Sequence, residues 1–288
     1  MLEPGMPFIR MGSGPRLLFL PGLSPDHAVP NGMDLAFQTR QLRPFAERHE
    51  VWWVNRRRGL PPGTTIAELA EDYARVVREH LEPPVDVVAV STGATIGLRL
   101  ALEHPELVRR LVVAGAARLS EPGRGAQRAV LDRLRDGRPR RAAARMFRTM
   151  AGGPLSGAAL LLLGWLVGKR MYGGDVADML VTAEAELDED VQGELRGIRA
   201  PTLVIGGARD RFYSPALLRS TAAGLDHGSL LLFGRMGHLR SMSSPHFPRA
   251  VLAFLEDRSL GSLVGGRRVS GRRSGLHQQA DPAVPGAR

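Results

Sequence analysis

Three side chains of the sequence could together carry out nucleophilic chemistry. Ser91, Asp210 and His238 each stand shortly after a short apolar run. A serine hydroxyl is a weak nucleophile at neutral pH until a base accepts its proton, and histidine titrates in the range that this task needs. A carboxylate can in turn fix the tautomer of the histidine and stabilise its protonated form. These residue types therefore predict attack of a serine on an acyl carbon.

The segment around Ser91 has the spacing of a tight turn between a strand and a helix. Val85–Val90 is apolar and rich in valine, which is typical of a buried parallel strand. Ala89 and Gly93 flank the serine two places away on either side. A nucleophile elbow requires small residues there, because bulky ones would collide with the following helix. Alanine replaces the usual first glycine, so the pattern is present in a modified form.

Each of the three residues also has a plain structural interpretation. Ser91 could be an ordinary turn residue, Asp210 could cap a helix beginning near Pro215, and His238 could be a polar loop residue. Their combination, in the order serine, aspartate, histidine and each after a predicted strand, favours a triad over three unrelated roles. His27 could line the pocket, but a catalytic role for it is not favoured.

Strands and helices alternate along most of the chain. The predicted strands are Arg16–Leu20, Val51–Asn55, Val85–Val90, Leu111–Ala114, Thr202–Ile205 and Ser229–Phe233. The predicted helices between and after them include Leu35–Arg48, Thr65–Leu81, Pro215–Ala223 and Phe247–Arg258. This alternation predicts an α/β fold with a mostly parallel sheet flanked by helices. Because ligands bind at the carboxyl edge of such a sheet, the three candidate side chains should converge there.

These motifs resemble the α/β-hydrolase superfamily over most of Arg16–Leu255. The resemblance implies that Ser91 is the nucleophile, Asp210 in GGARD the triad acid, and His238 in GRMGH the general base. It also implies an oxyanion hole made by the backbone N–H groups of Leu23, in LPGLS, and Thr92. Pro21 stands where that loop often has histidine. The resemblance implies no metal and no organic cofactor.

The resemblance also suggests how the chain divides. Residues 1–117 and 197–258 are expected to form the α/β-hydrolase core, residues 118–196 an inserted helical cap, and residues 259–288 a basic disordered tail. Within the cap, Thr149–Gly168 is twenty residues long and has no charge. We expect a buried or pocket-facing helix there, which would favour an apolar substrate. A contact with a membrane surface is the less favoured alternative.

The net charge of +10 does not by itself indicate nucleic-acid binding. The tail carries five arginines against one aspartate, and the acidic block 175–194 can screen the basic residues earlier in the cap. No zinc-finger spacing or RNA-binding signature accompanies the charge, so we expect no nucleic-acid partner. The sequence has no cysteine, which excludes disulfides, and the first residues do not resemble a signal peptide. A cytoplasmic enzyme is the prediction, with its oligomeric state left open.

The type of nucleophile narrows the reaction. Ser91 argues against the aspartate-nucleophile hydrolases, and the absence of cysteine argues against the cysteine-dependent ones. The sequence predicts a serine hydrolase that acts on an ester-type small molecule with an apolar acyl group through an acyl-enzyme. A thioesterase or acyltransferase, or a hydrolase of carbon–carbon bonds, could use the same triad. A catalytically silent binding protein with this fold is a further alternative. The substrate itself is not specified by the pattern.

Overall fold

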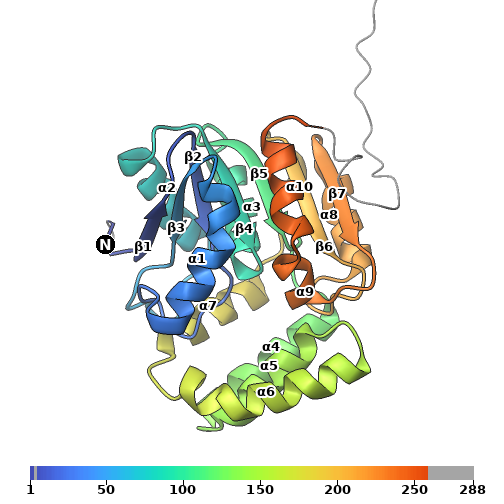
Figure 1. Ribbon diagram of the computed structural model, residues 1–288. Helices are drawn as coiled ribbons and strands as arrows, with labels where there is room; N and C mark the ends of the chain where they lie inside the picture. The colour runs from blue at the N-terminus through green and yellow to red at the C-terminus, as the bar shows by residue number, and fades with distance from the viewer. Residues whose placement is uncertain (3–4, 259–288) are drawn as a thin grey trace, which may run out of the picture.

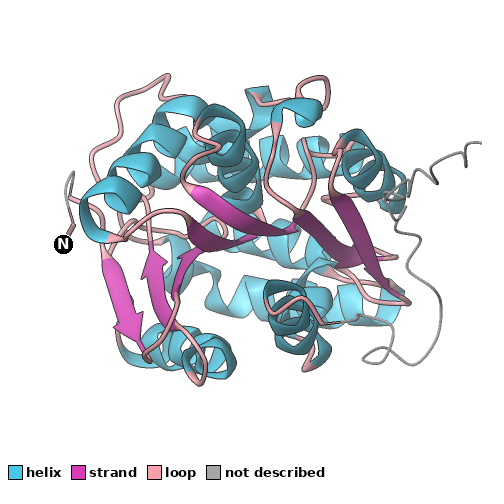
Figure 2. Cartoon of the chain, turned by 90° about the horizontal axis from the view of Figure 1, so that it is seen from above, coloured by secondary structure: helices cyan, strands magenta, loops and turns pink. Residues whose placement is uncertain are grey.

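A seven-stranded sheet forms the centre of the molecule (Figures 1 and 2). The computed structural model describes residues 1–2 and 5–258. The strands lie in the order β1-β3-β2-β4-β5-β6-β7, and all neighbours pair in parallel except β1, which is antiparallel to β3. Their bounds are β1 Phe8–Met11, β2 Arg16–Leu20, β3 Glu50–Val54, β4 Val85–Val90, β5 Val108–Ala114, β6 Thr202–Gly207 and β7 Gly228–Phe233. The predicted α/β class is confirmed.

Helices cover both faces of the sheet (Figure 2). Strand residues alternate between two apolar clusters, one on each face of the sheet, with Leu18 in one cluster and Leu17 in the other. The helices are α1 Gly32–Ala46, α2 Ile66–His80, α3 Thr92–Glu103, α8 Pro215–Gly224, α9 His238–Ser243 and α10 His246–Leu255. A capping box formed by Thr65 and Glu68 begins α2, because each side chain accepts a hydrogen bond from the other residue's backbone N–H. Two short elements, β1 and α9, were not predicted from the sequence.

Four further helices lie between β5 and β6. They are α4 Glu121–Arg135, α5 Pro139–Met150, α6 Pro154–Tyr172 and α7 Ala177–Asp188, and the 3₁₀ turn η1 Leu195–Gly197 follows them. Helices α4, α5 and α6 lie side by side beyond the carboxyl end of the sheet, while α7 lies closer to the sheet and contacts α2 and α3 (Figure 1). The division into core and cap stays a prediction. The predicted tail, 259–288, lies outside the described residues.

The expectation that the uncharged segment forms a buried helix is wrong. Helix α6 is present, but its buried residues are Gly157, Gly164, Gly168 and Tyr172. Five large apolar side chains of α6 are exposed, among them Leu155 at 88% and Leu166 at 59% of their full accessibility, and others such as Leu160 and Leu161 are half-buried. Within the described residues, no helix is both long and apolar enough to cross a membrane.

Candidate functional site

Ser91 stands at the sharp turn between β4 and α3. Its backbone has φ 53° and ψ −126°, a strained conformation for a residue with a side chain. The turn is held on both sides, because the Ser91 N–H donates to the Ala114 carbonyl on β5 and the Ala94 N–H donates to the Ser91 carbonyl. A Cβ at Gly93 would lie 2.5 Å from the Leu20 carbonyl oxygen. The turn therefore needs glycine at this position, as the sequence pattern implies.

The methyl group of Ala89 fits in the fold because it faces a glycine, Gly97, on α3. A Cβ built on Gly97 of α3 would lie 2.8 Å from the Ala89 Cβ, which is too close for two methyl groups. The fold thus places one methyl group at this crossing of β4 and α3. The usual elbow puts a glycine on the strand, whereas here the glycine is on the helix. Ala89 is therefore compatible with the elbow.

The three predicted catalytic side chains form a chain of two hydrogen bonds, with His238 between Ser91 and Asp210. The Ser91 Oγ is 3.0 Å from the His238 Nε2, and the His238 Nδ1 is 2.8 Å from the Asp210 Oδ2. His238 and Asp210 are buried, and Ser91 is partly accessible. Because the carboxylate can only accept, Nδ1 carries a proton and Nε2 of a neutral ring is free to accept one from the serine.

Asp210 does not cap α8. That role belongs to Ser214, whose hydroxyl accepts from the Leu217 N–H. The other carboxylate oxygen of Asp210, Oδ1, accepts from the backbone N–H groups of Phe212 and Tyr213 at 2.8 and 3.1 Å. These bonds fix the carboxylate plane, so that Oδ2 points to the histidine.

The loop that carries His238 is packed against the turn that carries Asp210. The Arg209 N–H donates to the Met236 carbonyl at 2.9 Å. A Cβ on Gly207 would lie 2.2 Å from the same carbonyl oxygen, so this close approach requires glycine. The Phe212 ring lies against the His238 ring, with 5.0 Å between centroids. Backbone contacts and ring packing thus set the distance between Asp210 and His238.

The predicted oxyanion loop lies beside the serine. A Cβ on Gly22 would lie 3.1 Å from the Ser91 Cβ, which places the backbone next to Leu23 against the elbow. Arg56 is fully buried beneath this loop. Its guanidinium donates to the carbonyls of Pro21 and Gly22, at 3.2 and 2.8 Å, and to the Ser24 Oγ at 3.1 Å. The shape of the loop therefore depends on a buried arginine.

His27 lies in this loop, but not in contact with Ser91. Its Nδ1 is 2.8 Å from the Arg57 carbonyl and must donate to it, and its Nε2 accepts from the Arg56 Nε at 3.2 Å. Burial, followed by the neighbouring Arg56 charge, lowers the pKa of His27 from 6.5 to about 3. His27 is thus a neutral structural residue that completes the set of acceptors around the arginine.

A buried carboxylate from α7 lies on the other side of the elbow. Glu186 accepts from the hydroxyl of Thr92 at 2.8 Å, from the amide of Gln127 at 3.0 Å and from the hydroxyl of Tyr213 at 2.9 Å. Thr92 follows the serine, and the Tyr213 N–H is one of the two that hold Asp210. Burial, and then the Glu186 charge, raise the pKa of the Tyr213 hydroxyl, which stays a donor. Glu186 therefore connects α7 to both ends of the candidate triad.

Arg56 and Glu186 were missed as candidate site residues. Arg56 is the first of three consecutive arginines in a predicted loop, and nothing local distinguishes the buried one from its neighbours. Glu186 belongs to the acidic block 175–194, which reads as a solvated surface. A helical pattern that places Glu186 between Ala183 and Leu187, both buried, was the available signal.

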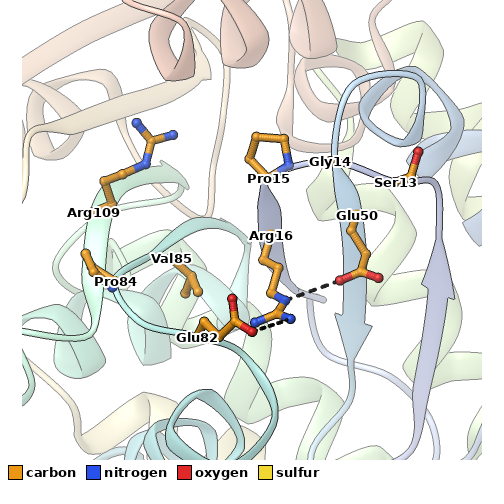
Figure 3. Close-up of a pocket in the computed structure, with 9 residues that line it drawn as sticks. All are labelled: Ser13, Gly14, Pro15, Arg16, Glu50, Glu82, Pro84, Val85 and Arg109. Carbon is orange, nitrogen blue, oxygen red and sulfur yellow. Dashed lines mark hydrogen bonds and ion pairs between the residues drawn. The ribbon is translucent and has the colours of Figure 1, made fainter.

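A separate hollow of about 400 Å³ lies at the opposite, amino-terminal edge of the sheet (Figure 3). Arg16, at the start of β2, pairs there with Glu50 at 3.4 Å and with Glu82 at 3.1 Å. Because strand length separates it from Ser91 and its charges are paired internally, we do not associate it with the candidate triad. The serine, histidine and aspartate lie at the carboxyl edge, as predicted for an α/β sheet.

Comparison with known proteins agrees with this arrangement. Residues 17–254 match the alpha/beta hydrolase family. A stretch of 199 residues is 28% identical to “Putative carbamate hydrolase RutD” of Serratia proteamaculans, covering 68% of this chain and 74% of that protein. A stretch of 277 residues is 27% identical to “Polyketide synthase ThaQ” of Burkholderia thailandensis, covering 90% of this chain but only 12% of that protein.

Among solved structures, the chain is similar to that of “Putative non-heme bromoperoxidase BpoC” from Mycobacterium tuberculosis. The TM-score is 0.73 with 22% identity, and the match covers 88% of this chain and 96% of the other. At this identity the likeness is one of fold.

Proposed function

Because this chain belongs to the alpha/beta hydrolase family and is an enzyme of hydrolase type, we propose that it cleaves ester-type acyl substrates through a triad of Ser91, Asp210 and His238. The observation that carries the proposal is the pair of contacts from Ser91 Oγ to His238 Nε2 and from His238 Nδ1 to Asp210 Oδ2, 3.0 and 2.8 Å. Both distances suit proton transfer along the chain of three residues.

The proposed reaction has two halves. Ser91 Oγ attacks the acyl carbon while His238 Nε2 takes its proton, and the backbone N–H groups of Leu23 and Thr92 stabilise the developing oxyanion. The alcohol departs with the proton from His238, which leaves an acyl group on Ser91. A water molecule, deprotonated by His238, then attacks the acyl-enzyme and releases the acid. Asp210 stabilises the protonated ring in both halves.

We include in the proposal an acyl group that is apolar. Helix α6 does not supply apolar contacts for it, because the leucines named above are exposed to solvent, so the basis is the residues around the triad. Leu23 is partly buried in the oxyanion loop, and the rings of Phe212 and Tyr213 pack against His238. Leu23 is partly accessible and offers an acyl chain an apolar contact, whereas the two rings are buried and form the apolar packing behind the histidine.

A fluorophosphonate probe tests the nucleophile directly. Such a probe should label the native protein at Ser91, and Ser91→Ala should abolish the labelling. The native protein left unlabelled would overturn the proposed mechanism. A series of p-nitrophenyl esters then tests the substrate class, with kcat/KM expected to rise with chain length.

The relative named as a carbamate hydrolase favours a second candidate substrate, a carbamate, because the same serine could attack its carbonyl carbon. Measuring p-nitrophenyl esters, N-alkyl carbamates and acyl thioesters side by side distinguishes these candidates. A kcat/KM for thioesters well above that for esters would favour the thioesterase or acyltransferase alternative. Ligand binding without turnover of any acyl substrate, unchanged by Ser91→Ala, would favour a silent binding protein.

A further inference from the structure

Helix α6 presents large apolar side chains that no other part of the described fold covers. Leu155, Leu162, Leu163, Trp165 and Leu166 are all exposed, between 43% and 88% of full accessibility. They lie outside the glycine contact between α6 and α5, on a helix that stands beyond the carboxyl end of the sheet (Figure 1). Exposed apolar patches of this kind mark interaction surfaces.

The packing of α6 on α5 explains why the large side chains point outward. A Cβ on Gly164 would lie 2.6 Å from the Ala143 carbonyl oxygen, and a Cβ on Gly168 would lie 2.7 Å from the Arg140 Cα. Glycines on α6 thus let the two helix backbones come into contact. Because the face toward α5 is made of glycine, the exposed leucines point away from α5, and Trp165 lies at the flank of the contact beside Arg140 of α5.

The hairpin formed by α5 and α6 carries positive charge and no negative charge. Residues 139–174 contain five arginines and lysines besides Arg140, and no aspartate or glutamate. The Arg140 guanidinium lies over the Trp165 ring, 4.6 Å from its centroid. A cavity of about 370 Å³ opens at this end of the hairpin, with a lining that includes Arg138, Arg140, Arg141, Trp165 and Lys169.

This cavity is suited to an anion. Arg138 has a carboxylate nearby, that of Asp136 at 3.5 Å. In the described part of the chain, no carboxylate lies within 4.0 Å of the charged nitrogens of the other three cations, Arg140, Arg141 and Lys169. Three uncompensated cations beside an exposed tryptophan attract a phosphate group whose apolar part can lie along the adjoining helix.

We propose that the α5–α6 hairpin docks on an anionic phospholipid membrane. The exposed leucines of α6 enter the boundary between headgroups and acyl chains, Trp165 lies at headgroup level, and the cavity takes a lipid phosphate. Apolar burial and attraction to anionic lipid together stabilise such interfacial helices. Charge decides against a second copy of this chain as the occupant, because two such surfaces would bring six cations against six. This inference goes beyond the proposed function, and its test does not require catalysis.

The hairpin also reaches the candidate active site. Its turn packs backbone to backbone against the loop before His238, since a Cβ on Gly237 would lie 2.5 Å from the Gly152 N. The Arg209 Nη1 donates to the Gly152 carbonyl at 3.4 Å. Docking would therefore place the membrane on an element that contacts the loops of the proposed base and acid.

Tryptophan fluorescence gives a local readout in the full chain. The sequence has three tryptophans, and Trp52 and Trp53 on β3 are buried, so a change on lipid binding reports Trp165. Vesicles of phosphatidylcholine that contain phosphatidylglycerol should shift the emission to shorter wavelength, and vesicles of phosphatidylcholine alone should do so at least about tenfold more weakly. Trp165→Phe should remove the shift. An emission unchanged by anionic vesicles would overturn the proposal.

Two variants with matched exposure locate the surface. The double variant Leu162→Ser with Leu166→Ser should weaken vesicle binding, measured by co-sedimentation, by roughly tenfold or more. Met33→Ser with Phe37→Ser changes two similarly exposed apolar residues on α1 and should leave binding unchanged. Equal binding by the α6 variant and the unaltered chain, or an equal loss in the α1 variant, would overturn the assignment to α6. Circular dichroism confirms that each variant is folded.

Two further measurements test whether the cationic cavity binds the lipid phosphate and whether a second copy of the chain covers α6 instead. Arg140→Gln with Arg141→Gln should weaken binding about tenfold and reduce its salt dependence. Binding that is indifferent to this change would refute the phosphate site. A lipid-free dimer that Leu162→Ser with Leu166→Ser dissociates would show that α6 joins two copies, and it would overturn the membrane proposal.

Discussion

Arg56→Lys should damage both stability and catalysis although it conserves the charge. The Arg56 guanidinium makes four hydrogen bonds, to the Pro21 and Gly22 carbonyls, the Ser24 Oγ and the His27 Nε2. An ammonium has three donors on one nitrogen and cannot reproduce the planar fork that reaches these acceptors. The Arg56 side chain has no exposed surface, and this burial lowers the pKa of its guanidinium.

The size of the effect follows from the bonds that lysine cannot make. A hydrogen bond to a charged group contributes about 1.5–3 kcal/mol, so the loss of one or two lowers the free energy of unfolding by about 3 kcal/mol. For a chain of this size that corresponds to a fall in Tm of roughly 6 °C. The removal of one oxyanion donor costs about 100- to 1000-fold in kcat, and a displaced donor should cost about tenfold to a hundredfold.

The assay compares Arg56→Lys with the same change one residue later. Arg57 is only partly buried, and its Nε donates to Asp72 at 2.8 Å, a carboxylate that a lysine can also reach. Arg57→Lys should therefore shift Tm by no more than about 2 °C and leave kcat for a p-nitrophenyl ester nearly unchanged. Unaltered Tm and kcat in Arg56→Lys, or equal losses in the two variants, would refute the role assigned to the buried guanidinium.

Three further predictions concern the surroundings of the elbow. Glu186→Gln replaces a carboxylate that accepts from three donors with an amide, and it should lower kcat for a p-nitrophenyl ester about tenfold. Asp188→Asn, at an exposed position of the same helix, should leave kcat unchanged. Equal kcat values for the two variants would contradict the role of Glu186. Gly97→Ala should lower the free energy of unfolding, measured by urea titration, by about 1–3 kcal/mol. Adding Ala89→Gly to that variant should restore part of the loss, because it removes the methyl group that the new side chain meets. Losses that simply add in the double variant would contradict a steric conflict between positions 89 and 97. His27 stays neutral in the folded protein, so stability is lost as pH falls below 6.5; between pH 7 and pH 5 the loss is about 2 kcal/mol, and His27→Asn should reduce it. An equal pH dependence in that variant would contradict the low pKa.

The sequence predicted the parts of the fold that depend on local pattern. The β4 run of valines, the elbow serine and the apolar strands β6 and β7 indicate parallel strands and place Ser91, Asp210 and His238 at one edge. The short edge strand β1 was missed because four residues paired on one side leave little periodic signal. The predicted catalytic roles, and those of the Leu23 and Thr92 amides, stay predictions that the labelling and kinetic experiments test.

Burial of charge was the property that local pattern could not supply. Arg56 is buried because the loop after β2 folds over it and offers carbonyl oxygens, a contact between segments about 35 residues apart. Glu186 is buried because three donors from α3, α4 and the Asp210 turn meet it. Each group would be costly to bury alone, and only the assembled fold provides its partners. From the sequence, the charges of Arg56 and Glu186 indicated side chains exposed to solvent. In the structure both are buried, and their hydrogen bonds hold the elements of the site together.

The opposite error occurred at α6, and its physical reason supports the docking surface. An apolar run is normally interpreted as buried, because a water-facing row of leucines has no stabilising partner. In α6 the residues that need close packing are the glycines at 164 and 168, which face α5 and leave no room for larger side chains. Hydropathy alone does not distinguish the glycine face from the leucine face. Once the helix pairing is known, the leucines must lie outside, and an apolar, positively charged surface is the consequence that the vesicle experiments test.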